Sequence, residues 1–325
     1  MDHSISFQHA IAPQGVLPPA QVAVHFTPLR GAGRTFKQWA EVYGRIIAAR
    51  KITPKTLADK LRWVDCLSEA LGERTIDSIL PFELAALFET IKEGGRETKA
   101  RRIGFEARDF FNEALLAGWI YRSPMHSVRL IKPTIRRQRL SLEQWHRMHG
   151  AASPGSIGAR LLRLALVSAQ RRADLAAVGP ADIWDDHLHI RQLKTGRYIA
   201  IPLELRLDVV GLSLRQVIEE CVQAAPGSTK LLPARHGGAS TVTRLSDVFV
   251  KHRRAVLEHF PEHPGKTLPS LHEVRSLAER LYREQGVDTQ TLLGHKFPST
   301  TNLYNDDRGS TMGLWKVVRL TPRAA

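Results

Sequence analysis

Residues 271–308 read LHEVRSLAERLYREQGVDTQTLLGHKFPSTTNLYNDDR, and polar groups suited to a reaction centre are denser here than elsewhere in the chain. Ser270 with Glu273 three residues later is the pattern of a capping box, which predicts that a helix begins at this point. His272 and Arg275 then lie one turn apart on one face of that helix. Because a helix N-terminus favours an anion such as phosphate, this face is predicted to bind one.

A second short helix and a further turn complete the stretch. The short helix should run from a cap at Asp288 to Gly294, and His295 follows at once. Ser299 can cap another turn, and this turn carries Tyr304. Any one of these side chains taken singly would be structural in most proteins. Their concentration makes two histidines, one arginine and one tyrosine candidates for a single site.

An arginine pair follows an unusually apolar helix further upstream. The predicted helix over 161–167 leads directly to Arg171 and Arg172, and Asp174 lies just beyond them. An arginine in this position is partly buried, and a buried guanidinium needs an anionic partner. That partner is either Asp174, in a fold-stabilising ion pair, or an external anion. The chemistry alone does not distinguish Arg171 from Arg172.

A lysine occupies the tip of a predicted hairpin. The stretches 187–191 and 198–203 alternate as strands around Lys194, Thr195 and Gly196. A lysine at a hairpin tip is usually only solvated, so the position by itself assigns it no role.

Together these residues resemble the tyrosine recombinases, or phage integrases. The motifs that carry the likeness occur in the family's order: Gln170-Arg171-Arg172-Ala173-Asp174-Leu175, Gln192-Leu193-Lys194-Thr195-Gly196, His272-x-x-Arg275, Leu292-Leu293-Gly294-His295, and Tyr304 nine residues later. The context Tyr304-x-Asp306-Asp307-Arg308-Gly309 is similar to the lambda-type integrases in particular. Each motif alone is weak, but the joint pattern is highly specific and spans about residues 35–318.

The resemblance implies a fold, an activity and a set of roles. The expected fold is mainly α with a small β-sheet (α+β), a helical core-binding domain preceding a tyrosine-recombinase catalytic domain. The expected activity is site-specific cutting and rejoining of DNA through a 3′-phosphotyrosine, for integration or excision of a mobile element, by a homotetramer on two DNA sites. The implied catalytic residues are Arg171, Lys194, His272, Arg275, His295 and Tyr304, with Asp174 orienting Arg171.

The composition agrees with a nucleic-acid partner. The chain has 325 residues and a net charge of +15, with a pI near 10.2. A basic surface of this kind attracts a polyanion, and nucleic acid is favoured over anionic lipid; the family resemblance implies double-stranded DNA. The start of the chain lacks the layout of a signal peptide, and no apolar run is long enough to span a membrane. Cys66 and Cys221 are expected to be free thiols, so the cytoplasm, on the nucleoid, is the expected compartment.

The spacing of apolar residues and the positions of proline and glycine predict four segments. Residues 1–34 are rich in proline and glycine and form an irregular arm, too short for the additional amino-terminal DNA-binding domain of lambda-type integrases. Residues 35–121 should form four helices, 122–140 a basic linker, and 141–325 the catalytic domain. Residues 314–320 have the composition of a short strand, so the last segment is predicted to end in a tail strand.

Clusters of basic residues suggest where DNA is contacted. The candidates lie on the last helix of the first domain, in the linker, and on a helix of the second domain: Lys99, Arg101, Arg102, Arg136, Arg137, Arg139, Lys251, Arg253 and Arg254. A solvated helix face or a flexible basic tether is the commoner meaning of any one such residue. Their clustering around the linker favours contacts with phosphates.

The chemistry expected of this set requires no cofactor. A tyrosine oxygen keeps the phosphodiester energy in a covalent intermediate, and phenol is a better leaving group than an alkyl hydroxyl. Arg171 and Arg275 offer forked donors to the phosphate oxygens. His272 is the candidate acceptor of the tyrosine proton, and Lys194 is implied as the acid for the leaving oxygen. No metal is predicted, because the remaining histidines lie in contexts that do not converge.

Two other functions fit part of the pattern. A type IB topoisomerase shares the cation set and the tyrosine, and a DNA-binding accessory protein or regulator would share only the basic surface. The context of Tyr304 and the preceding helical domain favour the recombinase. Accessory DNA-bending or directionality proteins are further candidate partners.

Overall fold

The computed structural model describes residues 33–235, 238–260 and 265–305. The chain divides into two compact units, with the boundary between Thr134 and Ile135. The predicted arm falls almost entirely outside the described residues, and so does the predicted tail strand. Among the described residues no helix is long and apolar enough to cross a membrane.

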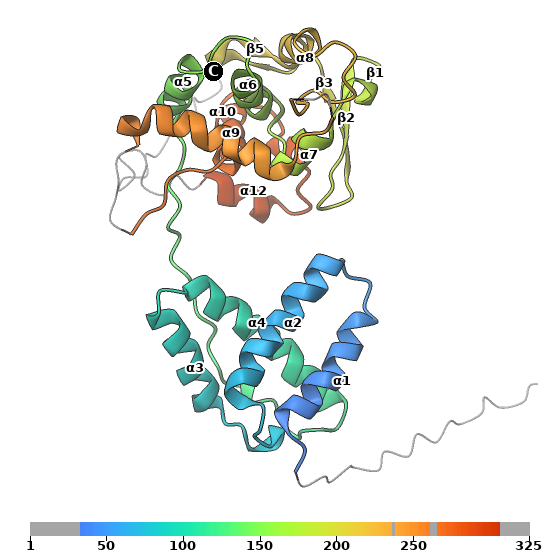
Figure 1. Cartoon of the computed structure of the whole chain (residues 1–325), viewed down its shortest axis with the longest axis vertical. Helices are drawn as coiled ribbons and strands as arrows, with labels where there is room; N and C mark the ends of the chain where they lie inside the picture. Colours follow the sequence, from blue (N-terminus) through green and yellow to red (C-terminus); the bar gives the residue numbers. More distant parts are fainter. Residues whose placement is uncertain (1–32, 236–237, 261–264, 306–325) are drawn as a thin grey trace, which may run out of the picture. The chain divides into compact units, whose positions relative to one another are not determined.

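The first unit is a bundle of four helices packed side by side (Figure 1). Their bounds are α1 Phe36–Ala48, α2 Pro54–Leu71, α3 Pro81–Glu93 and α4 Glu97–Leu116, with short 3-10 turns at Ile76–Ser78 (η1) and Pro124–His126 (η2). The sequence signals for helix starts act as expected. Thr35 and Gln38 form a capping box for α1, and proline opens both α2 and α3.

Aromatic side chains fill the centre of this bundle. Phe36 and Phe110 stack with ring centroids 4.4 Å apart, and Tyr43 meets Phe110 edge-on at 5.1 Å. The buried Trp39 donates its indole N–H to the Phe110 carbonyl at 3.1 Å. The largest apolar surfaces of α1 and α4 are thereby removed from water with their polar atoms satisfied.

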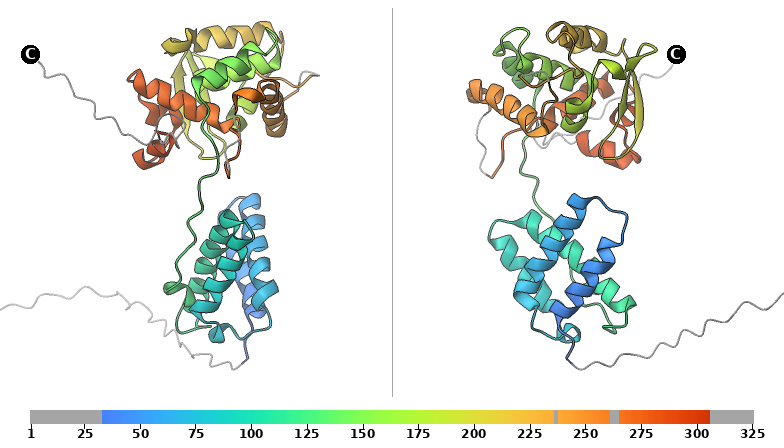
Figure 2. Two further views of the ribbon diagram at one scale, coloured as in Figure 1. Left: turned by 90° about the vertical axis from the view of Figure 1, so that its left-hand side faces the viewer. Right: turned by 45° about the vertical axis from the view of Figure 1, so that its right-hand side comes forward.

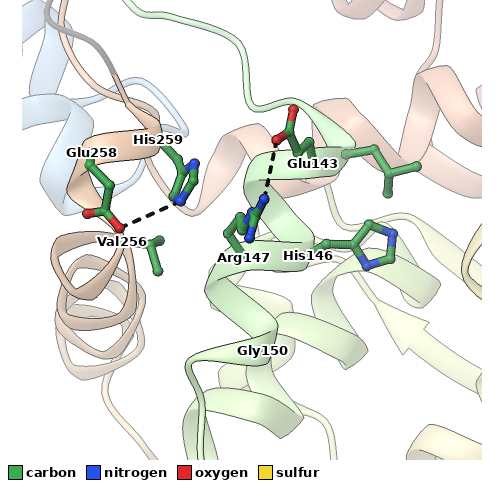
Figure 3. A pocket seen from close by; sticks show the side chains of 8 residues that line it. Glu143, His146, Arg147, Gly150, Val256, Glu258 and His259 are labelled. Carbon is green, nitrogen blue, oxygen red and sulfur yellow. Dashed lines mark ion pairs between the residues drawn. The ribbon is translucent and has the colours of Figure 1, made fainter.

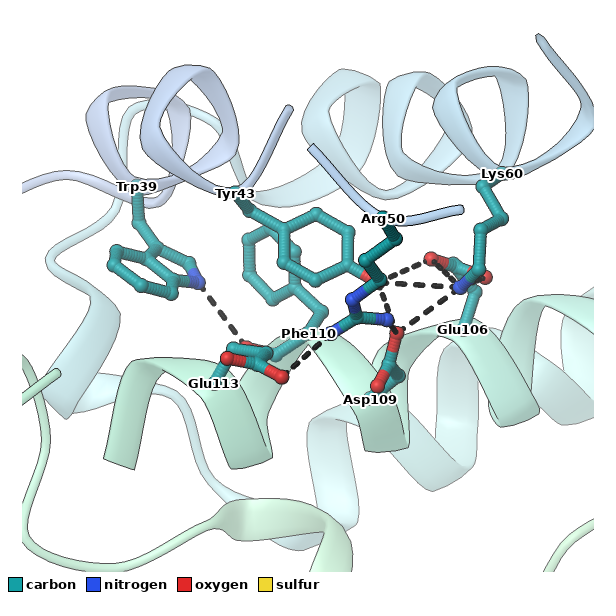
Figure 4. A network of polar contacts seen from close by, with 8 residues as sticks. All are labelled: Trp39, Tyr43, Arg50, Lys60, Glu106, Asp109, Phe110 and Glu113. Atoms are coloured by element: carbon teal, nitrogen blue, oxygen red, sulfur yellow. Dashed lines mark hydrogen bonds and ion pairs between the residues drawn. The ribbon is translucent and has the colours of Figure 1, made fainter. Parts of the chain in front are cut away.

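A closed network of charges crosses the same bundle (Figure 4). Lys60 on α2 lies 2.8 Å from Glu106 and 3.0 Å from Asp109, both on α4. Arg50, just beyond α1, lies 2.7 Å from Asp109 and pairs with Glu113 as well. Burial by itself would raise the pKa of Asp109, but hydrogen bonds from Arg50, Tyr43 and Lys60 outweigh it and lower the pKa to about 2. Each charge in this network therefore has an opposite charge beside it.

The predicted basic linker is shorter in the structure than the range 122–140. Met125 and Val128 belong to the core of the first unit, and Leu130 and Ile131 pack against it. Leu140 belongs to the core of the second unit. The linker is shorter because apolar residues lie between its arginines. These apolar side chains pack into the cores of the two units, whereas the side chains of a flexible tether would stay solvated.

The second unit surrounds α6 (Ile157–Ser168) with other helices (Figure 2). α6 packs against α5, α8, α9 and α10. The helices are α5 Leu142–Gly150, α7 Arg172–Ala177, α8 Leu214–Gln223, α9 Val242–Ala255, α10 His272–Glu284, α11 Thr289–Leu293 and α12 Pro298–Asn305, with 3-10 turns η3 Pro180–Asp182, η4 Asp208–Val210 and η5 Leu257–His259. Because nearly every side chain of α6 is buried, the unit is built around it.

Two small antiparallel sheets complete the unit. β1 (Ile183–Trp184), β2 (His187–Arg191) and β3 (Tyr198–Pro202) are adjacent in that order, and His189 is opposite Ala200. β4 (Arg206–Leu207) pairs with β5 (Leu212–Ser213). The predicted hairpin is confirmed, and so is the mainly helical fold with a small sheet.

Two of the predicted helix caps are wrong. α10 begins after Leu271 without a side-chain cap, and the Ser270 carbonyl rather than its hydroxyl accepts from the Glu273 amide. The Glu273 carboxylate instead pairs with a buried arginine. α12 begins at Pro298, so Ser299 lies inside the helix that it was expected to cap.

Candidate active site

Tyr304 and His272 meet where α12 and α10 come together. The Tyr304 hydroxyl lies 3.1 Å from His272 Nε2. His272 is the first residue of α10, and Tyr304 lies in the last turn of α12, half-buried. They are 32 positions apart, and the chain between them folds back through α11, so two side chains far apart in the sequence share one hydrogen bond.

Arg275 lies one turn further along α10 and is 1% exposed. It donates to the carbonyl of Ala169 at 2.7 Å and to that of Leu293 at 2.6 Å, which fixes the guanidinium between α6 and α11. Burial, then the charge of Arg171, lowers the pKa of Arg275 to about 10, against an opposing effect of Tyr304. Among the described residues no carboxylate is paired with this cation.

The second histidine lies against the same group. His295 Nε2 is 3.4 Å from an Arg275 nitrogen, and His295 Nδ1 is 2.9 Å from the Thr301 hydroxyl. Its ring centroid lies 5.3 Å from that of Tyr304. The site therefore receives His295 from the loop after α11 and holds it with a contact from α12.

Both histidines are neutral at pH 7. Burial, with the charges of Arg275 and Arg171, lowers the pKa of His295 to about 4. The pKa of His272 is also lowered to about 4, first because protein atoms displace water around the ring, then by Arg275, Arg137, Arg171 and Lys194. Although His272 as a whole residue is exposed, these cations act in the same direction as the loss of water. A neutral imidazole beside a phenol can accept its proton.

Gln192 joins three parts of the site and was missed by sequence reasoning. It is fully buried. Its oxygen accepts from Arg171 at 2.6 Å and from the Thr195 hydroxyl at 2.8 Å. Its nitrogen donates to Gln170 at 3.1 Å and to the Leu293 carbonyl at 3.0 Å. One amide with all its bonds made thus fixes Arg171, the turn that carries Lys194 and the segment before His295.

Gly294 explains how this amide fits. A Cβ at this position would lie 2.7 Å from the Gln192 oxygen and 2.7 Å from Ile199, and the backbone has φ +61°. Only glycine allows both the left-handed conformation and the close approach. Local sequence rules identified Gly294 as a helix end, but the residue that needs the space is about a hundred positions away.

Lys194 is exposed in the turn between β2 and β3. Figures 1 and 2 show this turn next to α12. The turn is held from both sides, because the Leu193 amide donates to Asp174 Oδ1 at 2.9 Å and Thr195 bonds Gln192. Asp174 therefore positions the lysine turn and makes no ion pair with Arg171 among the described residues.

The two adjacent arginines separate clearly. Arg171 bonds Gln192, and its charge lowers the pKa values of His272, His295 and Arg275. Arg172 is exposed and donates to the Ser246 hydroxyl on α9 at 2.8 Å. Arg171 therefore lies with the other candidate site residues, whereas Arg172 contacts a helix on the surface.

Arg139 corrects the predicted set of DNA contacts. It is 4% exposed, and its guanidinium lies 3.1 Å from Glu273. A side chain so enclosed cannot reach a phosphate on a duplex. A charge run in an irregular stretch resembles a solvated tether, and only the fold shows that one member of the run points inward.

The other basic candidates differ in accessibility. Arg101, Arg102, Arg136, Arg137, Lys251 and Arg254 are exposed. Lys99 and Arg253 are half-buried, and Arg253 donates to the Pro269 carbonyl at 2.5 Å. Arg253 therefore holds the segment that leads into α10, and the exposed six stay candidates for phosphate contacts.

A surface pocket of the second unit is separate from this site (Figure 3). It lies beside α5, and its lining includes the pair Glu143–Arg147 at 4.0 Å and the pair Glu258–His259 at 3.6 Å. No candidate catalytic residue lines it. In the part of the chain that the structure describes, no three His, Cys, Asp or Glu side chains gather as metal ligands would.

Comparison with known proteins gives the class. The model of the phage integrase family matches residues 138–310. The integrase of Escherichia phage HK022 is 36% identical over 278 residues, which cover 85% of this chain and 76% of that protein. The chain belongs to the phage integrase family of tyrosine recombinases and is therefore an enzyme that breaks and rejoins DNA strands.

Solved structures agree with this assignment. A lambda integrase dimer bound to a COC′ core site matches with a TM-score of 0.79 and 30% identity, covering 88% of this chain and 81% of the other. A lambda integrase tetramer bound to a Holliday junction matches with a TM-score of 0.80 and 29% identity, with coverages of 88% and 81%. The matched length includes both units, so the similarity extends beyond the catalytic unit.

Proposed function

We propose that the protein recombines double-stranded DNA at specific sites, with Tyr304 as nucleophile, to integrate or excise a mobile element. The observation that carries the proposal is the Tyr304 hydroxyl, 3.1 Å from a neutral His272 and among the cations Arg275 and Arg171. A phenol beside a base and fixed positive charges is the arrangement that attack on a phosphodiester requires.

The first step transfers a phosphodiester from DNA to the protein. Tyr304 Oη attacks phosphorus and forms the new P–O bond, while the bond from phosphorus to the 5′-oxygen breaks. The tyrosine proton passes to His272, and Lys194 donates a proton to the departing 5′-oxygen. The product is a 3′-phosphotyrosine and a free 5′-hydroxyl, so no external energy source is consumed.

The second step is the same reaction in reverse with a different strand. A 5′-hydroxyl from the partner duplex attacks the phosphotyrosine, Lys194 accepts its proton, and the Tyr304 oxygen leaves with a proton returned from His272. Because the two steps use the same groups in opposite roles, the site catalyses both cutting and rejoining.

Arg171 and Arg275 are assigned to the non-bridging phosphate oxygens. Charge grows on these oxygens in the transition state, and forked guanidinium donors match their geometry. His295 is assigned a further hydrogen bond to the phosphate, and its contact with the Thr301 hydroxyl sets the orientation of its ring. Removal of one such donor typically slows a reaction by about 10²–10³-fold.

The same proposal covers the partners. We infer that the substrate is double-stranded DNA contacted by exposed basic residues of both units, and that four copies of the chain act on two DNA sites. The DNA-bound dimer and the junction-bound tetramer of lambda integrase support this inference. Accessory DNA-bending or directionality proteins, and action on the nucleoid in the cytoplasm, are parts of the same proposal.

A nicked suicide substrate tests the function. A nick beside the cleavage site lets the short fragment with the free 5′-hydroxyl diffuse away. Without this hydroxyl the strand cannot be rejoined, so the covalent adduct accumulates and survives denaturation. We expect the wild-type chain to form the adduct on its own attachment-site DNA, and Tyr304→Phe to bind that DNA equally well but form none. An adduct that persists in Tyr304→Phe contradicts the assignment of the nucleophile.

A further inference from the structure

Arg139 lies just ahead of α5 and is enclosed by the second unit. Its Nη1 donates to Glu273 Oε2 at 3.1 Å and to the Ser276 hydroxyl, and its Nη2 donates to the Leu303 carbonyl at 2.6 Å. Its side chain and that of Glu273 are each 2% exposed. One guanidinium therefore ties α10 to α12.

Each of the three partners is the neighbour in sequence of a residue of the proposed site. Glu273 follows His272, Ser276 follows Arg275, and Leu303 precedes Tyr304. On α10, His272 and Arg275 share one face, and Glu273 and Ser276 share the adjacent one. Arg139 thus contacts α10 on the face beside the one that carries His272 and Arg275, and it contacts the backbone of α12 next to Tyr304.

The contact with Leu303 has a clear physical basis. Leu303 lies in α12, two positions before Asn305, the last residue that the structure describes. The Arg139 guanidinium donates to the Leu303 carbonyl, and its charge strengthens this hydrogen bond one residue from Tyr304.

We propose that Arg139 is a positioning residue for the nucleophile. Its planar fork spans Glu273 on α10 and the Leu303 carbonyl on α12, and it thereby sets the separation of His272 and Tyr304. This proposal rests on the proposed function, since it assigns Arg139 a part in the attack by Tyr304. A lysine cannot replace it, because one ammonium lacks the rigid fork that reaches both partners.

Three variants separate positioning from folding. Arg139→Met removes the guanidinium and with it the ion pair to Glu273. Arg139→Met with Glu273→Leu removes both charges, so the fold recovers while the Leu303 carbonyl still lacks its donor. Arg139→Lys keeps an ion pair with Glu273 but not the fork. The matched control is Arg163→Met with Glu220→Leu, a pair at 2.9 Å between α6 and α8 in the same unit.

The experiment uses the full chain and the nicked substrate at saturating DNA. We expect the Arg139→Met/Glu273→Leu protein to melt near the wild-type temperature and bind DNA equally well, yet form adduct about 100-fold more slowly, the typical effect of misplacing a reacting group by about 1 Å. Arg139→Lys should recover stability but only part of the rate. The control pair should form adduct at the wild-type rate.

A second substrate identifies the affected step. A bridging 5′-phosphorothiolate leaves without a proton, so it relieves a defect in the acid but not one in the nucleophile. The Arg139 defect should therefore persist on this substrate. Relief by sulfur, a defect confined to DNA binding, or a folded double variant that forms adduct at the wild-type rate would each overturn the proposal. If the wild-type chain itself forms no adduct through Tyr304, the proposed function fails instead.

Discussion

In the first unit, Lys60 and Arg50 each lie within 3.0 Å of carboxylates, and these carboxylates bond a tyrosine as well. In the second unit, Arg171 and Arg275 bond an amide oxygen, carbonyls and a histidine, and among the described residues no carboxylate pairs with either. Charges neutralised inside the protein hold helices together. Cations that are not neutralised by a carboxylate can bind an anion from outside the protein. For that reason we infer that Arg171 and Arg275 bind phosphate.

Arg139 shows that this comparison also holds within the second unit. It lies close to the same helix as Arg275, yet it is paired with Glu273 and enclosed. Arg139 and Arg275 are both buried, so burial does not distinguish a structural arginine from one that binds phosphate. The group that each arginine contacts does distinguish them. This distinction can be tested by replacing a cation that is paired with a carboxylate and, separately, one that is not. For each variant, the free energy of unfolding and the cleavage rate are measured.

The largest expected effect comes from Lys194, an exposed cation of the site. Lys194→Ala should slow cleavage by about 10²–10⁴-fold, since proton transfer to the leaving oxygen is lost. The free energy of unfolding of this variant should differ from that of the wild type by less than about 0.5 kcal/mol, because the side chain is exposed. Single-turnover cleavage and chemical unfolding measure the two quantities. The defect should shrink on a 5′-phosphorothiolate substrate, and an equal defect on both substrates removes Lys194 from the acid role.

The opposite result is expected for a paired lysine. Lys60→Met leaves the carboxylates of Glu106 and Asp109 with less compensation, so the free energy of unfolding should fall by about 3 kcal/mol. Protein that stays folded should keep its cleavage rate at saturating DNA. Urea unfolding and adduct formation at low temperature provide the comparison. A loss of chemistry without a loss of stability would show that this network also serves the reaction.

Acid should affect the two units in different pH ranges. The pKa values of His272 and His295 lie near 4 in the folded protein, below about 6.5 in an unfolded chain. The unfolded chain binds more protons in that window, so their contribution to stability is present above about pH 6.5 and is lost as pH falls toward 4. Asp109, with a pKa of about 2, contributes above about pH 4 and loses that contribution between pH 4 and 2.

Hydrogen exchange followed by mass spectrometry on the full chain resolves the two ranges. Peptides from α10 to α12 should lose protection between pH 6.5 and 4, after correction for the intrinsic exchange rate. Peptides from α1, α2 and α4 should keep theirs until the pH falls below 4. Loss of both sets in one range would contradict the different environments of the two groups.

The smallest effect concerns exposed cations of the first unit. Arg101→Ala with Arg102→Ala should make the slope of log K against log salt shallower by about 2, because each arginine should neutralise one phosphate. Lys55→Ala with Arg62→Ala is the matched control, because these residues share Asp59 on the surface of α2. Fluorescence anisotropy at several salt concentrations measures both. Equal slopes in the two variants would remove the α4 arginines from the DNA contacts.

The residues of the proposed site were chosen from motifs in the sequence. The motif spacing indicated which arginine, lysine, histidines and tyrosine to consider, and the structure brings Tyr304, His272, Arg275 and His295 into one group. Helix starts at Thr35 and Pro54 also followed from local capping chemistry. These features depend on few residues or on motifs with a fixed spacing.

The supporting residues could not be predicted in the same way. Gln192 acquires its role only when positions 170, 171 and 293 converge on it. Glu273 had the spacing of a capping residue, but a buried Arg139 was the stronger partner for its carboxylate. Both outcomes depend on contacts between segments more than twenty residues apart, and local propensity carries no information about such contacts.

The role of Arg171 at the phosphate can be tested by removing the negative charge from the DNA rather than the positive charge from the protein. A methylphosphonate at the scissile position is neutral, so it no longer needs the guanidinium of Arg171. We predict that Arg171→Ala slows adduct formation on ordinary phosphate by about 10²–10³-fold but has a much smaller defect on the methylphosphonate. The exposed Arg172→Ala, its matched control, should behave alike on both. An Arg171→Ala defect of the same size on the two substrates would contradict this assignment, because Arg171 would then not be acting on the charge of the phosphate.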